Sequence, residues 1–390
     1  MIKVLYIIDS LKAYGAEKSL VLLATSFKQV QPVFISLGCQ VELQALLESK
    51  GIKVYSGIFN ENTSKSKAIK EIAEIVKNEQ PSIIHSTLFK SDSISRKLKV
   101  RFPQIPLVGS LVSNSYSKNR YKKLSLFSRL KLFRTQMQDR LTSQKVDFFI
   151  SNSEAIVRSN MKALGIPENK IRIIHRGRAL PLTETKHNHN ILEKFSGKKV
   201  FISVGRLSDS KGQMDLVGAF KKIDLKRLNI VLLIIGDGPD YQRLKKEITA
   251  NNLQDHIKLM GYRKDVDYLL HYANFFIFPS YYEGLPGALI EAVMAKVPCV
   301  VSDIPENREC FPIGGGLFFE AGNVPSIVQK IEESLEYSEW EEEVERNYQH
   351  AAKNFSLELA VKKYEEFYIH IFENYSNIIG DSNQKAKMKR

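Results

Sequence analysis

The chain has 390 residues, of which 43% are hydrophobic and 26% charged. This length suits about two domains, and this composition excludes an intrinsically disordered chain. Cys39, Cys299 and Cys310 are too few and too widely spaced for a disulfide scaffold or an all-cysteine zinc site, and they suit a reducing cytoplasm. The sequence has no run of about 18 apolar residues, so we expect no membrane-spanning helix.

The net charge of +14 is unevenly distributed along the chain. Residues 1–180 hold 30 basic and 13 acidic side chains, whereas residues 181–390 hold 27 and 30. The excess positive charge therefore belongs to the first half, which we expect to meet an anionic partner or surface.

Short apolar runs alternate with amphipathic runs from the start of the chain. We expect helices at 16–27, 41–49 and 68–78, and strands at 3–8, 33–36, 53–55, 82–85, 107–110 and 148–150. A strand–helix alternation of this kind predicts a parallel sheet that is covered by helices on both faces.

A polar stretch interrupts this pattern at 181–197, and we interpret it as a linker. The alternation then resumes with strands expected at 200–204, 230–235, 257–259, 275–279 and 297–302. We therefore predict an α/β protein with two doubly wound domains. Ligands of such domains bind at the carboxyl ends of the strands, where strand order reverses, and the cleft between two domains is the default site.

The predicted boundaries place an N-terminal domain at 1–180 and a C-terminal domain at 198–354. A C-terminal helix at 355–376 is expected to pack back on the N-terminal domain, and a basic tail follows at 377–390.

Several common catalytic motifs are missing from the sequence. It contains no Gly-x-x-x-x-Gly-Lys-Ser/Thr, no Gly-x-Gly-x-x-Gly after the first strand and no Gly-x-Ser-x-Gly. These absences argue against a P-loop NTPase, a dinucleotide-dependent dehydrogenase and a serine hydrolase.

Two cations follow the first strand of the second domain. Gly205 allows a sharp turn after the strand at 200–204, and Arg206 and Lys211 then precede a helix expected at 214–220. Two cations near a helix N-terminus suit a diphosphate. An ordinary surface loop is the alternative that this segment alone leaves open.

Two glutamates occur in the segment 279–291. Glu283 lies in a loop after an apolar strand, and Glu291 lies more than one turn into the helix that follows. The amides of Gly284 and Leu285 are expected near the N-terminus of this helix, which favours an anion. The two carboxylates can bind sugar hydroxyls from one cleft, or they can be a solvated pair.

These segments together resemble retaining glycosyltransferases of family 4. Glu283 and Glu291 form the Glu-x7-Glu pattern of the nucleotide-sugar-binding domain of that family. The resemblance implies the GT-B fold, in which two Rossmann-like domains face a central cleft. It implies that the domain at 1–180 binds the acceptor and that the domain at 198–354 binds the nucleotide-sugar. The similar segments occur in the family's order at 205–220, 236–244, 261–303 and 355–368.

The first half resembles the family more faintly. The loop at 10–20 is similar to the family's glycine-rich first loop, with Tyr14-Gly15 where the family has Gly-Gly. The segment 151–174 is also similar, but it continues as His-Arg-Gly-Arg at 175–178, where the family favours an Asn-Gly turn. His85 matches the first of two histidines that the family often has at a strand end, and Thr87 replaces the second.

The resemblance implies a role for each matching residue. Arg206 and Lys211 would bind the donor phosphates and stabilise the leaving nucleoside diphosphate without a metal or other cofactor. Glu291 would bind the ribose, and Glu283 would contact the transferred sugar and act with the two cations as the catalytic group. His85 would contact a sugar, or it would be a satisfied buried histidine. The other donor contacts would be the amides of Gly284, Leu285 and Gly15, and Tyr262 and Arg263 beside the base.

The implied reaction moves a hexosyl or N-acetylhexosaminyl group from a nucleotide-sugar donor, with UDP as the expected nucleotide. The expected acceptor is a glycan on a lipid, used in polysaccharide, lipopolysaccharide or glycolipid assembly. Retention in the family is explained by attack from the front face of the sugar, so no enzyme nucleophile is required.

A basic, amphipathic segment lies in the first half. Residues 96–145 contain 13 Lys or Arg and one acidic residue, Asp139. A helix within 120–142 would place apolar side chains on one face, namely Leu126, Leu130, Phe133, Met137 and Leu141. Such a helix is typical of proteins that lie on an anionic membrane, and we expect a peripheral protein on the cytoplasmic face. The alternative is a helix that packs on its own sheet.

Two further readings remain open at this point. One is a nucleic-acid-binding protein, suggested by the basic first half, although the sequence has no recognised nucleic-acid motif and we expect no such partner. The other is a different GT-B enzyme, such as a sugar-nucleotide epimerase or a phosphorolytic enzyme, because a fold alone does not fix function.

Overall fold

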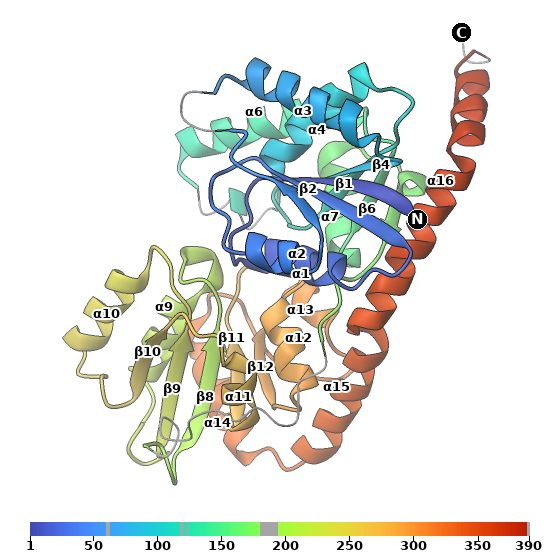
Figure 1. Ribbon diagram of the computed structural model, residues 1–390. Helices are drawn as coiled ribbons and strands as arrows, with labels where there is room; N and C mark the ends of the chain where they lie inside the picture. The colour runs from blue at the N-terminus through green and yellow to red at the C-terminus, as the bar shows by residue number, and fades with distance from the viewer. Residues whose placement is uncertain (60–62, 118–119, 122–123, 180–193, 388–390) are drawn as a thin grey trace. The chain divides into compact units, whose positions relative to one another are not determined.

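The computed structural model describes residues 1–59, 63–117, 120–121, 124–179 and 194–387. The chain forms two compact units (Figure 1). Unit 1 comprises residues 1–177 and 357–390, and unit 2 comprises residues 178–356. The chain therefore passes from one unit to the other after Gly177 and returns after Ser356.

Unit 1 is built on a seven-stranded sheet in which all paired strands are parallel. The spatial order is β3-β2-β1-β4-β5-β6-β7, so strand order reverses between β1 and β4. The strands are β1 (Ile2–Ile8), β2 (Val30–Ser36), β3 (Lys53–Tyr55), β4 (Ile83–Thr87), β5 (Leu107–Leu111), β6 (Phe148–Ser151) and β7 (Ile171–Ile173). The central strands β1 and β4 are buried along almost their whole length, as a sheet covered on both faces requires.

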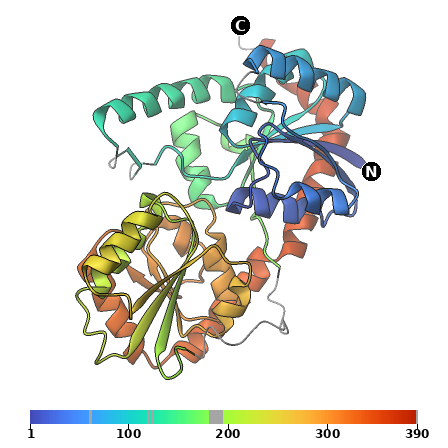
Figure 2. The ribbon, with the colours of Figure 1, turned by 60° about the vertical axis from the view of Figure 1, so that its left-hand side comes forward.

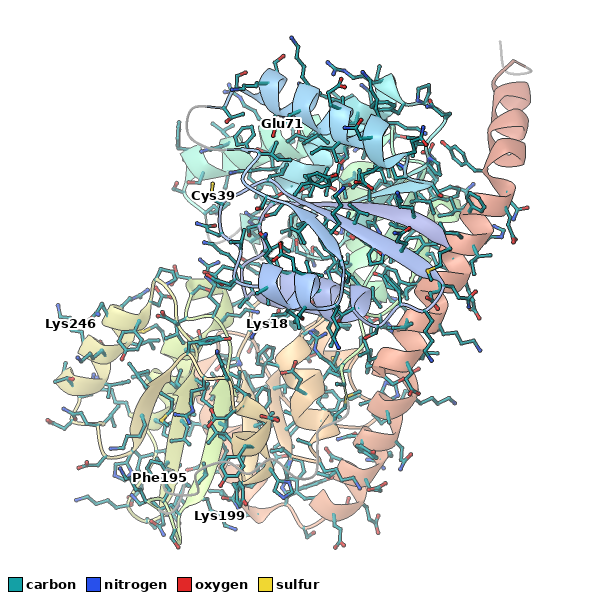
Figure 3. All side chains as sticks on the ribbon, in the orientation of Figure 1. Lys18, Cys39, Glu71, Phe195, Lys199 and Lys246 are labelled. Atoms are coloured by element: carbon teal, nitrogen blue, oxygen red, sulfur yellow. The ribbon has the colours of Figure 1, made fainter. Side chains whose placement is uncertain are left out.

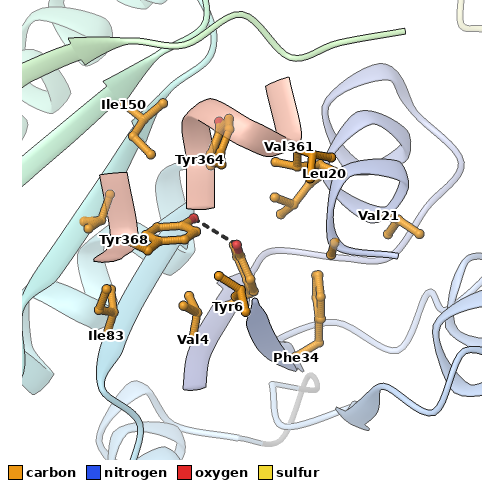
Figure 4. Close-up of a cluster of buried hydrophobic side chains, with 14 of the residues drawn as sticks. Val4, Tyr6, Leu20, Val21, Phe34, Ile83, Ile150, Val361, Tyr364 and Tyr368 are labelled. Atoms are coloured by element: carbon orange, nitrogen blue, oxygen red, sulfur yellow. Dashed lines mark hydrogen bonds between the residues drawn. The ribbon is translucent and has the colours of Figure 1, made fainter. Parts of the chain in front are cut away.

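Helices cover both faces of this sheet (Figures 1 and 2). One face carries α1 (Gly15–Ala24), α2 (Gln44–Ser49) and α16 (Leu357–Lys387). The other carries α3 (Lys65–Glu79), α4 (Phe89–Arg101) and α7 (Glu154–Leu164), with α6 (Leu126–Ser143) packed against α4 and α7 and a 3-10 turn, η1 (Glu168–Lys170), before β7. Figure 4 shows the core on the first face, where Tyr364 and Tyr368 of α16 meet Tyr6 and Phe34 of the sheet.

Unit 2 is built on a six-stranded parallel sheet in the order β10-β9-β8-β11-β12-β13. Its strands are β8 (Lys199–Val204), β9 (Ile230–Ile235), β10 (Ile257–Gly261), β11 (Phe275–Phe278), β12 (Cys299–Ser302) and β13 (Leu317–Phe319). Strand order reverses between β8 and β11, which are neighbours in the sheet.

The helices of unit 2 also lie on both faces of its sheet. One core contains residues of α11 (Val266–His271), α12 (Gly287–Met294) and α15 (Trp340–Phe355). The opposite core contains residues of α9 (Gln213–Phe220), α10 (Tyr241–Ala250) and α14 (Val324–Glu336). Two short elements, η2 (Asp209–Lys211) and α13 (Pro305–Arg308), follow β8 and β12.

The predicted α/β class with two parallel sheets is confirmed, although some element bounds differ. The sequence analysis missed β7 and β13, which have three residues each and give little periodic signal. Helix α16 begins at Leu357 and continues to Lys387, beyond the predicted end at residue 376. A glycine within that stretch, Gly380, weakens a helix but keeps its N–H, so it does not end one. Residues 181–193, which are most of the predicted linker, and residues 388–390 of the tail lie outside the described residues.

The three cysteines are free thiols, with Cys39 exposed in unit 1 (Figure 3) and the other two buried in unit 2. Within the described residues, no helix combines the length and the apolar character needed to cross a membrane.

Candidate functional site

The strand reversal of unit 2 brings two loops together. Residues 205–212 follow β8 and residues 279–286 follow β11, and these neighbouring strands are parallel. Both loops therefore leave the same edge of the sheet, at the point where ligands of doubly wound sheets bind. The sequence motifs with Arg206 and Glu283 lie in these two loops.

Glycine allows the two loops to approach each other closely. Gly212 has a φ of +68°, and a Cβ atom there would lie 2.2 Å from the carbonyl oxygen of Pro279. The amide of Tyr281 donates to the carbonyl of Ser210 at 3.0 Å, which joins the same two loops. A larger residue at 212 would separate these loops, because the Pro279 carbonyl belongs to the backbone and cannot rotate away.

Lys211 and Glu283 meet across these loops. The Lys211 Nζ lies 2.5 Å from the Glu283 Oε1, and the Glu283 side chain is only 8% exposed. The ammonium also lies 5.8 Å from the centre of the Phe278 ring. The sequence predicted both residues as site residues, and the structure brings them into direct contact. Such a pair offers a cation to a phosphate and a carboxylate to a sugar hydroxyl.

Arg206 lies on the same loop as Lys211, with an exposed side chain. Its backbone carbonyl accepts a hydrogen bond from the Gln213 side chain at 3.2 Å. On the other side, Gly236 approaches so closely that a Cβ atom there would lie 1.9 Å from the carbonyl oxygen of Gly205. The loop is thus fixed by the segments on both sides, which holds the start of the Arg206 side chain in place.

Glu291 lies on α12, which begins after its N-cap residue, Pro286. Gly284 and Leu285 immediately precede this helix, whose first amides have no partner within the helix. The Glu291 side chain is 45% exposed, and its Oε1 lies 2.9 Å from the Nε of Arg178. The sequence analysis assigned no role to Arg178, although it lies in the His-Arg-Gly-Arg segment that departs from the family pattern.

Tyr262 and Arg263 follow β10, on the far side of β9 from β8. Tyr262 exposes 53% of its side chain. The guanidinium of Arg263 binds both carboxylate oxygens of Asp265, at 2.8 and 2.5 Å. The sequence predicted both residues beside a base, and the exposed ring of Tyr262 is suited to stacking.

Gly15 of unit 1 is exposed at the first position of α1, and a Cβ atom there would meet nothing within 4 Å. The sequence predicted that the Gly15 amide donates to the ligand. Gly15 is the first residue of α1, and the first amides of a helix have no acceptor within the helix.

His85 is buried in the interior of unit 1, with no exposed surface. Its Nδ1 is hydrogen-bonded to the Tyr368 hydroxyl at 2.6 Å and its Nε2 to the Ser110 hydroxyl at 2.7 Å. Burial lowers the pKa of His85 to about 3, so the ring is neutral at physiological pH. These contacts favour the structural alternative over the predicted sugar contact. Thr87, which replaces the family's second histidine, is also buried and bonds to Ser110 at 2.9 Å.

The same network contains two residues that the sequence analysis missed. Tyr368 of α16 bonds to the Tyr6 hydroxyl at 2.8 Å (Figure 4) as well as to His85. Arg176 is buried and donates to the carbonyl of Ala16 at 2.8 Å and to Ser110 at 3.2 Å. The only sequence signal for Arg176 was its place in the unusual 175–178 segment.

Helix α6 of unit 1 packs on its neighbours largely through polar groups. Asp139 forms an ion pair with Arg96 of α4 and accepts a hydrogen bond from the Tyr116 hydroxyl at 2.9 Å. Gln136 donates to the carbonyl of Ala163 of α7 at 3.1 Å. Apart from the buried Leu132, the large apolar side chains of α6 are half-exposed or exposed.

We define the apolar face of α6 as five side chains that are each at least 52% exposed: Leu126, Phe127, Leu130, Phe133 and Leu141. Four of them belong to the predicted apolar stripe, whose fifth member, Met137, is half-buried. The helix lies on the outside of unit 1 (Figure 2) and also exposes Arg129, Lys131, Arg134 and Arg140. Lys122 and Lys123, which the sequence placed in the same basic region, lie outside the described residues.

Within the described residues, His, Cys, Asp and Glu side chains form no group of three or more that could hold a metal ion.

Comparisons with known proteins match both units. A model of the glycosyl transferases group 1 family matches residues 184–354, and a model of glycosyltransferase family 4 matches residues 15–180.

Several curated relatives are glycosyltransferases by name. An uncharacterized glycosyltransferase of Methanocaldococcus jannaschii is 32% identical over 39% of this chain and 37% of its own length. The 2-deoxystreptamine N-acetyl-D-glucosaminyltransferase of Niallia circulans is 31% identical over 34% of this chain and 35% of its own length. The chain thus matches only about a third of the length of these two relatives. A longer match, 27% identical over 68% of this chain and 69% of the relative, is with the UDP-Gal:alpha-D-GlcNAc-diphosphoundecaprenol alpha-1,3-galactosyltransferase of Escherichia coli.

Solved structures share the fold. Anabaena HepE in complex with UDP and glucose has a TM-score of 0.80 at 19% identity, over 94% of this chain and 99% of that chain. The apo form of the lipopolysaccharide outer core galactosyltransferase WaaB has a TM-score of 0.69 at 16% identity, over 96% and 100%. The predicted GT-B fold is confirmed. Because the two glycosyltransferase models together match residues 15–180 and 184–354, the chain belongs to the glycosyltransferases of group 1 and family 4 that these models describe.

Proposed function

We propose that this protein is a retaining glycosyltransferase that transfers a hexosyl or N-acetylhexosaminyl group from a UDP-sugar to a lipid-linked glycan acceptor. The product would serve the assembly of a polysaccharide, lipopolysaccharide or other glycolipid. The observation that carries the proposal is the contact between Lys211 and Glu283, in loops that follow the two strands at the reversal of unit 2.

The Lys211–Glu283 pair suits a donor that carries both negative charge and hydroxyl groups. In the free protein each side chain satisfies the other, at 2.5 Å. A bound donor would give Lys211 a phosphate oxygen and give Glu283 a sugar hydroxyl, so neither charge would lose its partner. Arg206, on the same loop, would contact the same diphosphate, and Glu291 would accept hydrogen bonds from the ribose hydroxyls.

The proposed reaction breaks the bond between the sugar C1 and the phosphate oxygen, and the electron pair leaves with the phosphate. An acceptor hydroxyl attacks C1 from the same face, and its proton moves to the departing phosphate oxygen. Negative charge grows on the diphosphate during this step, and the cations of Arg206 and Lys211 stabilise it. These two side chains would supply the positive charge without a divalent metal.

The relatives support the choice of donor and acceptor. HepE was solved with UDP and with UDP-glucose. The E. coli relative is named as using UDP-Gal and a diphosphoundecaprenol-linked sugar, and a Campylobacter jejuni relative is also named as acting on a diphospho-undecaprenol-linked sugar. These names favour UDP and an acceptor carried on a lipid diphosphate.

A thermal-shift measurement without added metal tests the donor site. UDP, GDP, ADP and CDP are added separately, followed by UDP-sugars. A ligand of the folded state at 100 times its Kd adds about 2.7 kcal/mol of stability, which raises the Tm measurably. We expect UDP to raise the Tm of the wild type and of Glu332→Ala, an exposed control on α14, by the same amount, and to raise that of Glu291→Ala by much less at the same UDP concentration. No shift with any nucleotide, or an equal shift in Glu291→Ala, would contradict the proposed donor site.

We also propose that the apolar face of α6 binds an anionic membrane surface, where a lipid-linked acceptor would be found. The helix holds its position through the buried Asp139–Arg96 pair and exposes apolar and basic side chains together. Apolar side chains of such a helix enter the interface between headgroups and acyl chains. Each Lys or Arg near an anionic surface adds about 1 kcal/mol of attraction. This arrangement supports peripheral association with the cytoplasmic face of the membrane.

Co-sedimentation with phosphatidylcholine vesicles, with and without phosphatidylglycerol, tests the membrane proposal. The variant Arg129→Gln/Lys131→Gln/Arg134→Gln removes three exposed charges of α6. At about 1 kcal/mol each, their loss weakens binding to the anionic vesicles by about 100-fold. The control Lys221→Gln/Lys222→Gln/Lys226→Gln removes three exposed charges of unit 2 and retains binding. Equal binding by both triple variants would refute a role for α6.

A further inference from the structure

Arg178 occupies an unusual place, at the point where the chain enters unit 2. Its amide donates to the carbonyl of Phe355 at 2.8 Å, and it pairs with Ser356 in an isolated parallel bridge. The two segments that join unit 2 to unit 1 are therefore bonded to each other at Arg178. The backbone of this residue is fixed independently of its side chain.

The Arg178 side chain extends from this anchor to α12. It is only 12% exposed, and its Nε lies 2.9 Å from the Glu291 Oε1. The structure leaves room for the guanidinium where α12 begins, because an ideal Cβ atom at Gly287 would lie 1.8 Å from the Arg178 Nη2. Any other residue at 287 would displace the guanidinium. The position of this side chain thus depends on both the Phe355 anchor and the absence of a side chain at Gly287.

We propose that Arg178 is a positioning residue for Glu291, and that it sets how strongly the site distinguishes a ribose from a 2′-deoxyribose. This inference rests on the proposed function, in which Glu291 binds the ribose hydroxyls.

The chemistry of the carboxylate supports this role. Glu291 is half-exposed on a helix surface, where a carboxylate can adopt several rotamers. The bond from the Arg178 Nε to Oε1 restricts these rotamers, and the second oxygen remains available to accept hydrogen bonds from a vicinal diol. Lysine at 178 would supply a charge without a planar donor at the Nε position, so it would restrict Glu291 less.

Two independent variants disturb this contact in different ways. Arg178→Ala removes the guanidinium. Gly287→Ala keeps both Arg178 and Glu291 but places a methyl group where the guanidinium lies, and alanine is a better helix former than glycine. Isothermal titration with UDP and with 2′-deoxy-UDP gives the ratio of the two Kd values. A general loss of structure would lower the affinity for both ligands equally, whereas a poorly positioned Glu291 lowers the affinity for UDP selectively.

We expect the wild type to prefer UDP over 2′-deoxy-UDP, and Arg178→Ala and Gly287→Ala each to reduce this preference at least threefold. Glu291→Ala is expected to abolish the preference, and Arg178→Ala is expected to change nothing further in that background. The control Lys296→Ala breaks the ion pair with Glu345 beyond the other end of α12 and keeps the wild-type ratio.

The two hypotheses fail in different ways. If the wild type binds neither nucleotide, or binds both equally, the assignment of Glu291 to the ribose is wrong. If the wild type prefers UDP and Glu291→Ala loses the preference, but Arg178→Ala and Gly287→Ala keep it, the role of Arg178 alone is wrong.

Discussion

The two units place polar side chains in their sheets in opposite ways. In unit 1, His85 and Ser110 lie within the sheet, fully or almost fully buried, and bond to Tyr368 and Arg176. In unit 2, Lys211 and Glu291 lie in or near the loops beyond the strands, partly exposed, and each pairs with one opposite charge. A buried group with all its bonds made cannot leave them without a large cost, whereas a partly exposed ion pair can exchange one partner for a ligand. The comparison supports a structural role for the first network and is consistent with the ligand binding that we propose for the second.

The largest expected effect separates activity from stability in unit 2. Arg206→Ala removes an exposed cation that would stabilise the leaving diphosphate, and we expect turnover to fall by about 100-fold or more. The free energy of unfolding should change by less than about 0.5 kcal/mol, because the side chain is at the surface. Steady-state kinetics and urea unfolding measure the two quantities. The control Lys246→Ala removes another exposed cation of unit 2 (Figure 3) and keeps full turnover. Equal activity of the two variants would show that Arg206 does not act in the donor site.

The next prediction concerns unit 1, where we expect stability to fall and ligand binding to stay unchanged. Tyr368→Phe removes the hydroxyl that bonds to His85 and Tyr6 inside the core, and leaves both groups without that partner. We expect a loss of about 1–3 kcal/mol in the free energy of unfolding. The affinity for UDP should be unchanged. In Tyr272→Phe the hydroxyl is removed from a side chain that is 46% exposed, and this control should unfold like the wild type. If Tyr368→Phe unfolds like the wild type but loses activity, the network around His85 serves activity and its assignment to a structural role is wrong.

A smaller effect concerns pH. Burial lowers the pKa of His85 from 6.5 to about 3 in the folded protein. Between these values the unfolded chain binds a proton that the folded protein does not, so this residue makes the protein less stable as the pH falls below 6.5. The free energy of unfolding changes by at most about 1.4 kcal/mol for each pH unit as a result.

The contribution of His85 to this pH dependence is best measured by urea unfolding of the wild type and of His85→Gln at several pH values. The difference between the two free energies of unfolding, plotted against pH, gives the slope. Buried Asp92, whose pKa is raised to about 7 by burial, acts in the opposite sense and cancels in this difference. Parallel pH profiles for the two proteins would show that His85 is not buried as a neutral ring.

The two units also differ in how much their sequences could predict. In unit 2 the apolar strands predicted the sheet, and the strand ends predicted that Arg206, Lys211 and Glu283 lie at one edge. This worked because these residues lie in the loops that follow two strands with a strong apolar pattern, β8 at Lys199–Val204 and β11 at Phe275–Phe278. The partner of Glu291 could not be predicted, because Arg178 lies more than a hundred residues earlier in the chain and only the fold brings the two together.

In unit 1 the strand that contains His85 was predictable, but its continuation to Thr87, which places His85 in the middle of β4, and the burial of His85 were not. The residue that covers it, Tyr368, belongs to the last helix of the chain and gives no local signal. Helix α6 shows the opposite case. Its apolar and basic pattern was visible in the sequence, but the pattern alone could not tell whether the apolar face meets the sheet or the solvent. The contacts of Asp139 and Gln136 with α4 and α7 decide this, because they turn polar groups inward.

The most direct test of the central claim is transfer of a labelled sugar to a lipid-diphosphate-linked sugar acceptor in anionic vesicles. UDP-sugars are supplied with a metal chelator, and wild type is compared with Lys211→Ala. We expect the wild type to transfer the label, with the anomeric configuration of the donor kept in the product, and Lys211→Ala to lose most of this activity. Equal transfer by the two proteins, inverted configuration, or no transfer from any UDP-, GDP- or ADP-sugar would contradict the account.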